Sequence, residues 1–218
     1  MFLGTEKIGE YIVTIFIKLS TMKRKILITL ILISVFSVKG QIGVQLTTMM
    51  PVSEIKTFLN TGYGIELGYF TSKQEDMFIN YFSFGYRMFD TKKVYESDQS
   101  GNPILSSYFK YDEYKEYVFG SYSDIRIFDK PVSPTLGLGA NIVINTFKNT
   151  NYTNNIATSS TDEFNFGFLL IPRIGVAYDL SYYFSLTAGL GYILRINKIK
   201  EPVDSYLNPY LGISFFLD

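Results

Sequence analysis

The 218-residue sequence contains no cysteine, no histidine and no tryptophan. Without cysteine the chain can form no disulfide, thiol nucleophile or thiolate metal site. Without histidine it lacks the usual general base near neutral pH, and therefore any Ser-His-Asp triad. Charged residues are also scarce, at 18% against roughly 25% in ordinary soluble domains. We therefore predict that the protein is not an enzyme, and we assign no catalytic, cofactor-binding or metal-ligating residue.

Aromatic residues and glycine are what the sequence has instead. Tyrosine and phenylalanine, 18 and 19 residues respectively, account for all of the 17% aromatic content. Lysine plus arginine equal aspartate plus glutamate at 20 each, so the formal net charge is zero. Because no strongly basic face is implied, we expect no nucleic-acid partner.

The segment 22–40, MKRKILITLILISVFSVKG, has a basic start, a short apolar run and small residues before Gln41. This pattern predicts a secretory signal peptide, because the apolar run is shorter than the roughly 20 residues of a spanning helix. A buried helix of the fold is the alternative. A signal peptide normally begins at its own methionine, so we interpret residues 1–21 as an extension from a misassigned start. The expected mature domain is 41–218.

The mature chain alternates between large apolar and small or polar residues. In TLGLGANIVIN, residues 135–145, Leu136, Leu138 and Ile142 fall on one face, whereas Gly137 and Asn141 fall on the other. A period of two is typical of a β-strand with two different faces. The same pattern defines eight predicted strands, which cover residues 41–51, 63–70, 80–89, 116–128, 135–145, 164–178, 184–197 and 206–218.

The predicted connections alternate in length. The short ones are 72–77, 129–133 and 179–182, and the longer polar ones are 52–62, 91–112, 150–163 and 198–204. Short turns at one end and long polar loops at the other are typical of an outer-membrane barrel. The remaining difficulty is Pro172, which cannot donate to a strand ladder, so we expect a β-bulge there.

The apolar face is too aromatic, and the opposite face too rich in glycine, for an ordinary soluble sheet protein. Small residues suit the crowded interior of a narrow barrel. We therefore predict an all-β, eight-stranded antiparallel up-and-down transmembrane β-barrel whose apolar face meets lipid. A soluble lipocalin-like carrier is the remote alternative, and would place the apolar side chains inside.

With these strands, the leader ending SVKGQ and the tail NPYLGISFFLD, the sequence resembles the small Gram-negative outer-membrane β-barrel proteins, the OmpA/OmpX-like or porin-family barrels. Its Asn-, Lys- and Tyr-rich composition resembles that of Bacteroidetes-type proteins. The tail departs from the family pattern because it ends at Asp218 rather than at an aromatic residue. The resemblance implies the cell outer membrane as location, with outer-membrane lipid and the barrel-assembly machinery as partners.

Charged residues recur on the predicted inward face. We expect a lumen charge network of Glu66, Arg87, Glu116 and Arg195 toward the outer end and Asp124, Arg126 and Arg173 toward the periplasmic end. Buried charges must be paired, so Arg87 should contact Glu66 or Glu116. The network is interpreted either as a structural salt-bridge network or as a gate on a small-solute path. The acidic pair Asp112–Glu113 is assigned to a solvated loop.

Two functional classes follow. The first is an integral outer-membrane barrel with a structural role, or with a role in binding an external ligand or protein through the long loops 91–112 and 150–163. The alternative is a transport or secretion-system component that forms a narrow pore. Neither requires a cofactor.

Overall fold

The computed structural model describes residues 41–52, 54–71, 76–128, 131–195 and 205–216. The predicted signal peptide and the extension before it lie outside the described residues. So do the whole of the connection 198–204 and the last two residues of the tail. Within the described ranges no helix is both long and apolar enough to cross a membrane.

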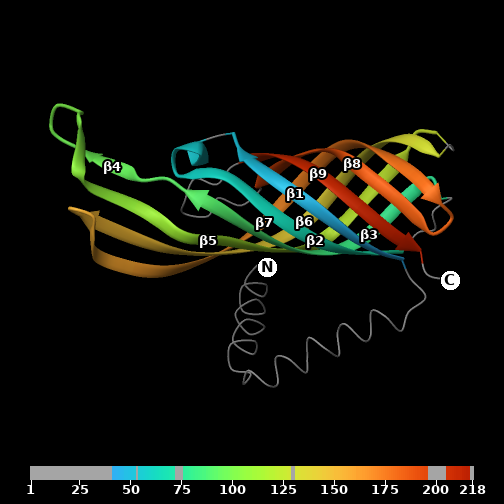
Figure 1. Cartoon of the computed structure of the whole chain (residues 1–218), viewed down its shortest axis with the longest axis horizontal. Helices are drawn as coiled ribbons and strands as arrows, with labels where there is room; N and C mark the ends of the chain where they lie inside the picture. Colours follow the sequence, from blue (N-terminus) through green and yellow to red (C-terminus); the bar gives the residue numbers. More distant parts are fainter. Residues whose placement is uncertain (1–40, 53, 72–75, 129–130, 196–204, 217–218) are drawn as a thin grey trace, which may run out of the picture. The chain divides into compact units, whose positions relative to one another are not determined.

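The described chain forms one antiparallel nine-stranded sheet that closes on itself (Figure 1). Its elements are β1 (Gln41–Pro51), the short 3-10 helix η1 (Glu54–Thr57), β2 (Leu59–Phe70), β3 (Phe78–Thr91), β4 (Val94–Ser97), β5 (Pro103–Arg126), β6 (Val132–Thr153), β7 (Ile156–Ser181), β8 (Phe184–Arg195) and β9 (Ser205–Phe216). Strand β1 pairs with both β2 and β9, and β3 pairs with β5, which closes the ring without β4. The ring therefore has eight strands, as predicted, and β4 is an addition that pairs only with β5.

The alternation of the sequence becomes an alternation of exposure around the ring. Leu136 is 52% exposed and Phe166 is 42% exposed, whereas the inward residues Arg87 and Glu116 are 0% and 1% exposed. A soluble barrel would show the opposite arrangement. The predicted orientation is confirmed: the large apolar side chains cover the outside of the barrel, and six of the seven charged side chains of the predicted network are buried inside it.

Two of the predicted long loops are wrong, because they are largely strand. Residues 91–112 contain β4 and the first half of β5, and residues 150–163 contain the end of β6 and the start of β7. The β6–β7 hairpin turns at Asn154 and Asn155, whose φ angles of 52° and 61° are the left-handed values of a two-residue type I′ turn. The polarity of these segments suggested loops, but a ladder satisfies the backbone whether or not the strand has an apolar face.

Strand segments 94–97, 103–112, 148–153 and 156–163 extend the sheet beyond the closed barrel. We call this extension the blade. It lies past the last β3–β5 pair, Met88 with Lys115, and projects beyond the ends of the other strands in Figure 1. Stacked rings strengthen it, since the centroids of Tyr108 and Tyr152 lie 4.8 Å apart. In outer-membrane barrels the long connections are extracellular, so the class predicted from the sequence implies that the blade lies on the outer side.

The turn between β4 and β5 supplies a pH-dependent prediction. Asp98 Oδ1 accepts hydrogen bonds from the backbone N–H groups of Asn102 and Ser100, both at 2.8 Å. These bonds, that from Asn102 foremost, lower the pKa of Asp98 below its usual value. Because the folded turn favours the ionised carboxylate, Asp98 stabilises the turn at pH values above the ordinary carboxyl pKa. This contribution is lost as the pH falls through the lowered pKa of the folded state.

On acidification we therefore expect the amide resonances of Ser100 and Asn102 to move together, with a midpoint below about 3.9, the ordinary aspartate pKa. NMR of the folded protein in micelles measures this directly. In the variant Asp98→Asn the transition should disappear. A midpoint at or above the ordinary value would contradict the assignment.

A β-bulge marks the junction of the blade with the barrel. The β5–β6 register shifts between Asp112 and Lys115, and Glu113 there has a φ of 55°. The extra residue places both Tyr111 and Tyr114 on the inward side, where they are 7% and 3% exposed. The bulge therefore explains how two tyrosines only three positions apart can both fill the mouth of the barrel.

Because Glu113 holds a left-handed conformation, Glu113→Gly should change the free energy of unfolding by no more than about 1 kcal/mol, whereas Glu113→Val should lower it by about 1–3 kcal/mol. The exposed pair of Glu113 with Lys115, at 2.8 Å, contributes little to either value. Urea titration followed by heat-modifiable gel migration measures both variants. Equal losses for glycine and valine would show that the side chain, not the backbone angle, matters.

The predicted bulge at Pro172 is wrong. Pro172 pairs with Leu138 in a continuous β6–β7 register, and the β7–β8 pairing resumes on the same register on either side of it. The ring of Pro172 is exposed on the outer surface. The proline is accommodated without an extra residue, so the residues that follow keep the faces that the alternation predicts.

Candidate functional site in the barrel interior

The interior of the barrel holds all seven charged residues of the predicted network, on five strands. Glu66 lies on β2, Arg87 on β3, Glu116, Asp124 and Arg126 on β5, Arg173 on β7 and Arg195 on β8. All except Arg195, which is partly exposed, are buried. The structure separates them into two clusters and two peripheral pairs.

We call the cluster nearer the blade the upper cluster and the other one the lower cluster. The upper cluster is built around Arg87, which pairs with Glu116 next to the last β3–β5 pair. Its Nη2 atom donates to Glu66 Oε1 at 2.6 Å, and its Nη1 atom lies 3.6 Å from Glu116 Oε2. Arg87 therefore contacts both carboxylates. Tyr122 and Tyr206 donate to the same two carboxylates, Tyr122 to Glu66 and Tyr206 to Glu116, each at 3.2 Å. The cluster is a compact set of two acids, one base and two phenols.

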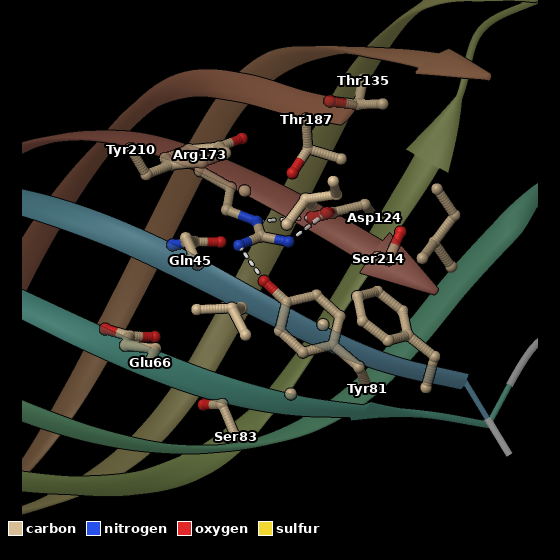
Figure 2. A pocket seen from close by; sticks show the side chains of 17 residues that line it. Gln45, Glu66, Tyr81, Ser83, Asp124, Thr135, Arg173, Thr187, Tyr210 and Ser214 are labelled. Atoms are coloured by element: carbon tan, nitrogen blue, oxygen red, sulfur yellow. Dashed lines mark hydrogen bonds and ion pairs between the residues drawn. The ribbon is translucent and has the colours of Figure 1, made fainter. Parts of the chain in front are cut away.

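The lower cluster is built around Arg173, whose Nε atom donates to Asp124 Oδ1 at 2.6 Å (Figure 2). Its Nη1 atom also donates to the hydroxyl of Tyr81. The guanidinium carbon lies 4.3 Å from the ring centroid of Tyr122, 5.0 Å from that of Tyr81 and 5.2 Å from that of Tyr210. An ion pair inside an aromatic cage compensates the cost of burying both charges.

The Arg173–Asp124 pair spans an intervening strand. Asp124 on β5 and Arg173 on β7 both pair with Gly137 on β6. A Cβ atom at Gly137 would overlap Asp124 Oδ1 and lie 2.8 Å from Asp124 Cγ. The glycine of the middle strand therefore leaves the space in which the two flanking side chains meet.

The remaining two predicted residues have partners that the sequence did not indicate. Arg126 Nη2 donates to Asp179 Oδ1 at 2.9 Å, although the sequence analysis placed Asp179 in a turn. Arg195 Nη2 donates to the side-chain oxygen of Asn145 at 3.0 Å. Arg195 thus belongs with the amides at the outer end rather than with the upper acids.

The inward tyrosines had no predicted role. Tyr81, Tyr122, Tyr206 and Tyr210 are all buried, and each contacts at least one of the two clusters; Tyr122 contacts both. The sequence does indicate that these tyrosines point inward, because each lies an even number of positions from an inward polar residue of its strand, as Tyr122 does from Asp124. Parity alone predicts that a tyrosine points inward; it does not identify its partner.

An apolar and aromatic layer lies over the upper cluster. It includes Ile55 of η1, Leu59 and Phe89, together with Tyr114 and Phe147, whose rings stack at 5.4 Å. Ile55 and Leu59 are 2% and 1% exposed. The helix η1 therefore contributes to a cap over the outer mouth.

The charges of the interior balance. Four arginines match four acids in number: Arg87 pairs with Glu66 and Glu116, Arg126 with Asp179 and Arg173 with Asp124, whereas Arg195 contacts the amide of Asn145. Among the residues of known placement, no group of three or more acidic side chains could hold a metal ion. The interior of the described barrel is thus a neutralised polar network and offers no cluster of unpaired acids.

The acidic pair Asp112–Glu113 lies in β5 at the bulge, so its assignment to a loop is corrected. Asp112 Oδ2 accepts from the hydroxyl of Tyr152 at 2.9 Å, and Lys110 lies 3.1 Å from Asp112 Oδ1. Glu113 pairs with Lys115. Both carboxylates are engaged, Asp112 at the base of the blade and Glu113 at the bulge.

No protein-family model and no curated protein matches the chain. Solved structures do. Neisserial surface protein A (NspA) aligns with a TM-score of 0.52 at 16% identity, over 83% of this chain and 98% of that one. A major outer-membrane protein of Thermus thermophilus aligns with a TM-score of 0.55 at 10% identity, over 81% and 98% of the two chains.

The closed ring, the apolar exterior, the enclosed charges and these likenesses define the class: the protein is an outer-membrane β-barrel with an OmpA/OmpX-like fold. Its location is the outer membrane, where lipid covers the exposed apolar band. The Bacteroidetes-type character of the sequence stays a prediction.

Proposed function

We propose that the protein is a sealed barrel that anchors the blade outside the membrane, where the blade serves as an interaction surface. The barrel conducts no solute and performs no catalysis. The observation that carries the proposal is the filled interior: Arg87, Glu66 and Glu116 lie across the lumen at 0%, 2% and 1% exposure, beneath the apolar cap. An eight-stranded ring leaves an interior that side chains can fill.

Planar-bilayer recording tests the seal. We expect no steady open state, because the ion pairs and the cap leave no continuous aqueous path. A known porin in the same bilayer is the positive control. A persistent conducting state would overturn the proposal and favour the alternative, a transport or secretion-system component with a narrow pore.

A variant with a shortened blade tests separately whether the barrel is sealed and whether the blade binds partners. Asn149 and Thr161 pair directly, so replacing residues 150–160 with Asn-Gly joins β6 to β7 by a short turn at that level. The trimmed barrel should stay silent in the bilayer and retain its heat-modifiable migration, because the seal lies below the cut. Conduction only after trimming would place the seal in the blade.

Interaction through the blade is supported by its exposed apolar residues. Leu105 is 75% exposed and Ile156 is 69% exposed, and both lie near the end of the blade. We expect cross-linking on intact cells to recover outer partners with the natural chain, and to recover fewer with the trimmed variant, which lacks Ile156 but keeps Leu105 of β5. Equal recovery with both would overturn this role.

Assembly and lipid contact complete the proposal. Strand β9 pairs with β1 and closes the ring, and its Leu211 and Phe215 are exposed outward. An outward apolar pattern in the closing strand supports recognition by the barrel-assembly machinery. Leu211→Asp should then slow assembly in vivo, and refolding in lipid vesicles should reveal any direct loss of stability.

A further inference from the structure

A small cavity lies between the two charge clusters of the interior. Its volume is about 30 Å³, and its walls include Glu66 of the upper cluster and Asp124 and Arg173 of the lower cluster (Figure 2). One water molecule needs roughly 10–15 Å³ measured in this way. The cavity therefore has room for about two water molecules and for nothing much larger.

One wall of the cavity carries a polar group without a partner. Ser83 is 7% exposed and lines the cavity, and its Oγ atom has no hydrogen-bond partner within the described part of the chain. A serine hydroxyl can donate one hydrogen bond and accept two. A buried hydroxyl of this kind is normally satisfied, by protein or by ordered water.

The strand register explains why no side chain satisfies Ser83. Its direct neighbours on the two flanking strands are Gly68 on β2 and Gly120 on β5. Neither glycine has a side chain that could reach the hydroxyl. The side chain of Asn141 fills the position beside Gly120, and its own Oδ1 atom has no hydrogen-bond partner among the described residues. Gly68 lines the cavity together with Ser83, so the space beside the hydroxyl lies on the β2 side.

Charge balance decides what fills this space. Glu66 is already paired with Arg87, and Asp124 with Arg173. An added ion would bring a charge that nothing compensates, which is costly in a buried site. An apolar guest would leave the Ser83 hydroxyl unsatisfied. A neutral molecule that both donates and accepts hydrogen bonds fits both conditions.

We propose that this cavity is a water-binding site in which one or two ordered water molecules bond to Ser83 Oγ. Since Glu66 and the Arg173–Asp124 pair line the same cavity, the bound water joins the two charge clusters into one hydrogen-bonded network. The site is independent of any partner of the blade.

Water–amide cross-relaxation on the folded ¹⁵N-labelled barrel in micelles tests the site. We expect cross-peaks from long-lived water to the amides around Ser83, and loss of them in Ser83→Val, whose methyl groups occupy the cavity. Ser121→Val is the matched control, because Ser121 lies on the outward face of β5, and its cross-peak pattern should match that of the natural chain.

Xenon provides the opposing probe, because dry apolar cavities bind it. The proposal expects no xenon-induced shifts around Ser83 in the natural chain. Absent water cross-peaks, or xenon shifts at these amides, would overturn it. Should Ser83→Val fail to fold, Ser83→Ala replaces it and should weaken the cross-peaks; the measurements on the natural chain decide the question in either case.

Discussion

Gly137→Ala is expected to lower the free energy of unfolding of the barrel by about 3–5 kcal/mol, the cost of breaking a buried ion pair. The added Cβ would overlap Asp124 Oδ1 and approach Ser123 O to 3.1 Å. Asp124 cannot move away freely, because Arg173 holds it by two contacts. The substitution must therefore displace Asp124 from Arg173 and leave a buried cation without its counter-ion.

Urea titration in lipid vesicles, read by heat-modifiable migration, measures this loss; the absence of tryptophan rules out the usual fluorescence assay. Gly191→Ala is the matched control. Gly191 is also buried, but its nearest contact would be a side-chain methyl of Ile171 at 3.2 Å, with the next atoms at 3.7 Å. We expect a loss of less than about 1.5 kcal/mol there, typical of a small steric adjustment. Similar losses for both variants would show that crowding alone, not the ion pair, is responsible.

Arg87→Met is the second substitution with a large expected effect. It removes the cation that contacts Glu66 and Glu116 while roughly keeping the length of the side chain. Two carboxylates would then remain buried without compensation, and we expect a loss of about 3–5 kcal/mol. The same urea titration measures it.

The triple variant Arg87→Met, Glu66→Gln and Glu116→Gln separates pairing from packing. Replacing a whole buried ion network by neutral groups is often close to neutral in stability. We therefore expect the triple variant to recover most of the loss of the single one. If it were as unstable as Arg87→Met alone, the shape of the Arg87 side chain would be the dominant factor, and the electrostatic account would be wrong.

The two substitutions act on separate clusters, and their combination tests whether the clusters interact. Arg87 and Gly137 share no direct contact, so independent sites would give additive losses. Tyr122 contacts both clusters, because it donates to Glu66 and its ring packs against Arg173, and the water proposed beside Ser83 would add a second link. We therefore expect a departure from additivity of more than about 0.5 kcal/mol. Strict additivity would show that neither link couples the two clusters, and would count against a network joined by the water.

Some features of this protein follow from the sequence alone because they depend only on neighbouring residues. The alternation around Leu136 and Leu138 has a period of two wherever the strand lies, so it determined which side chains face outward. The inward charges, such as Arg87, followed from the same parity. The scarcity of charge and the aromatic content then indicated that the outward face meets lipid.

The predictions were wrong where the secondary structure was inferred from the type of side chain rather than from the strand with which the backbone pairs. The blade was predicted as loops because residues 150–163 bury little, yet a strand needs only a partner for its backbone. Pro172 was expected to force a bulge, yet its ring points outward and the register continues through it. The bulge lies at Glu113 instead, where one extra residue allows both Tyr111 and Tyr114 to point inward.

The sequence by itself determined the faces of the strands, the class of fold and the enclosed charges other than Asp179, because side-chain alternation is a local property of the backbone. Only the tertiary structure decided which side chains meet. Asp124 and Arg173 are 49 residues apart, and Tyr81 and Arg173 are 92 apart. Their contact depends on the register of three strands and on closure of the ring, which are set by the whole sheet at once and by no single segment.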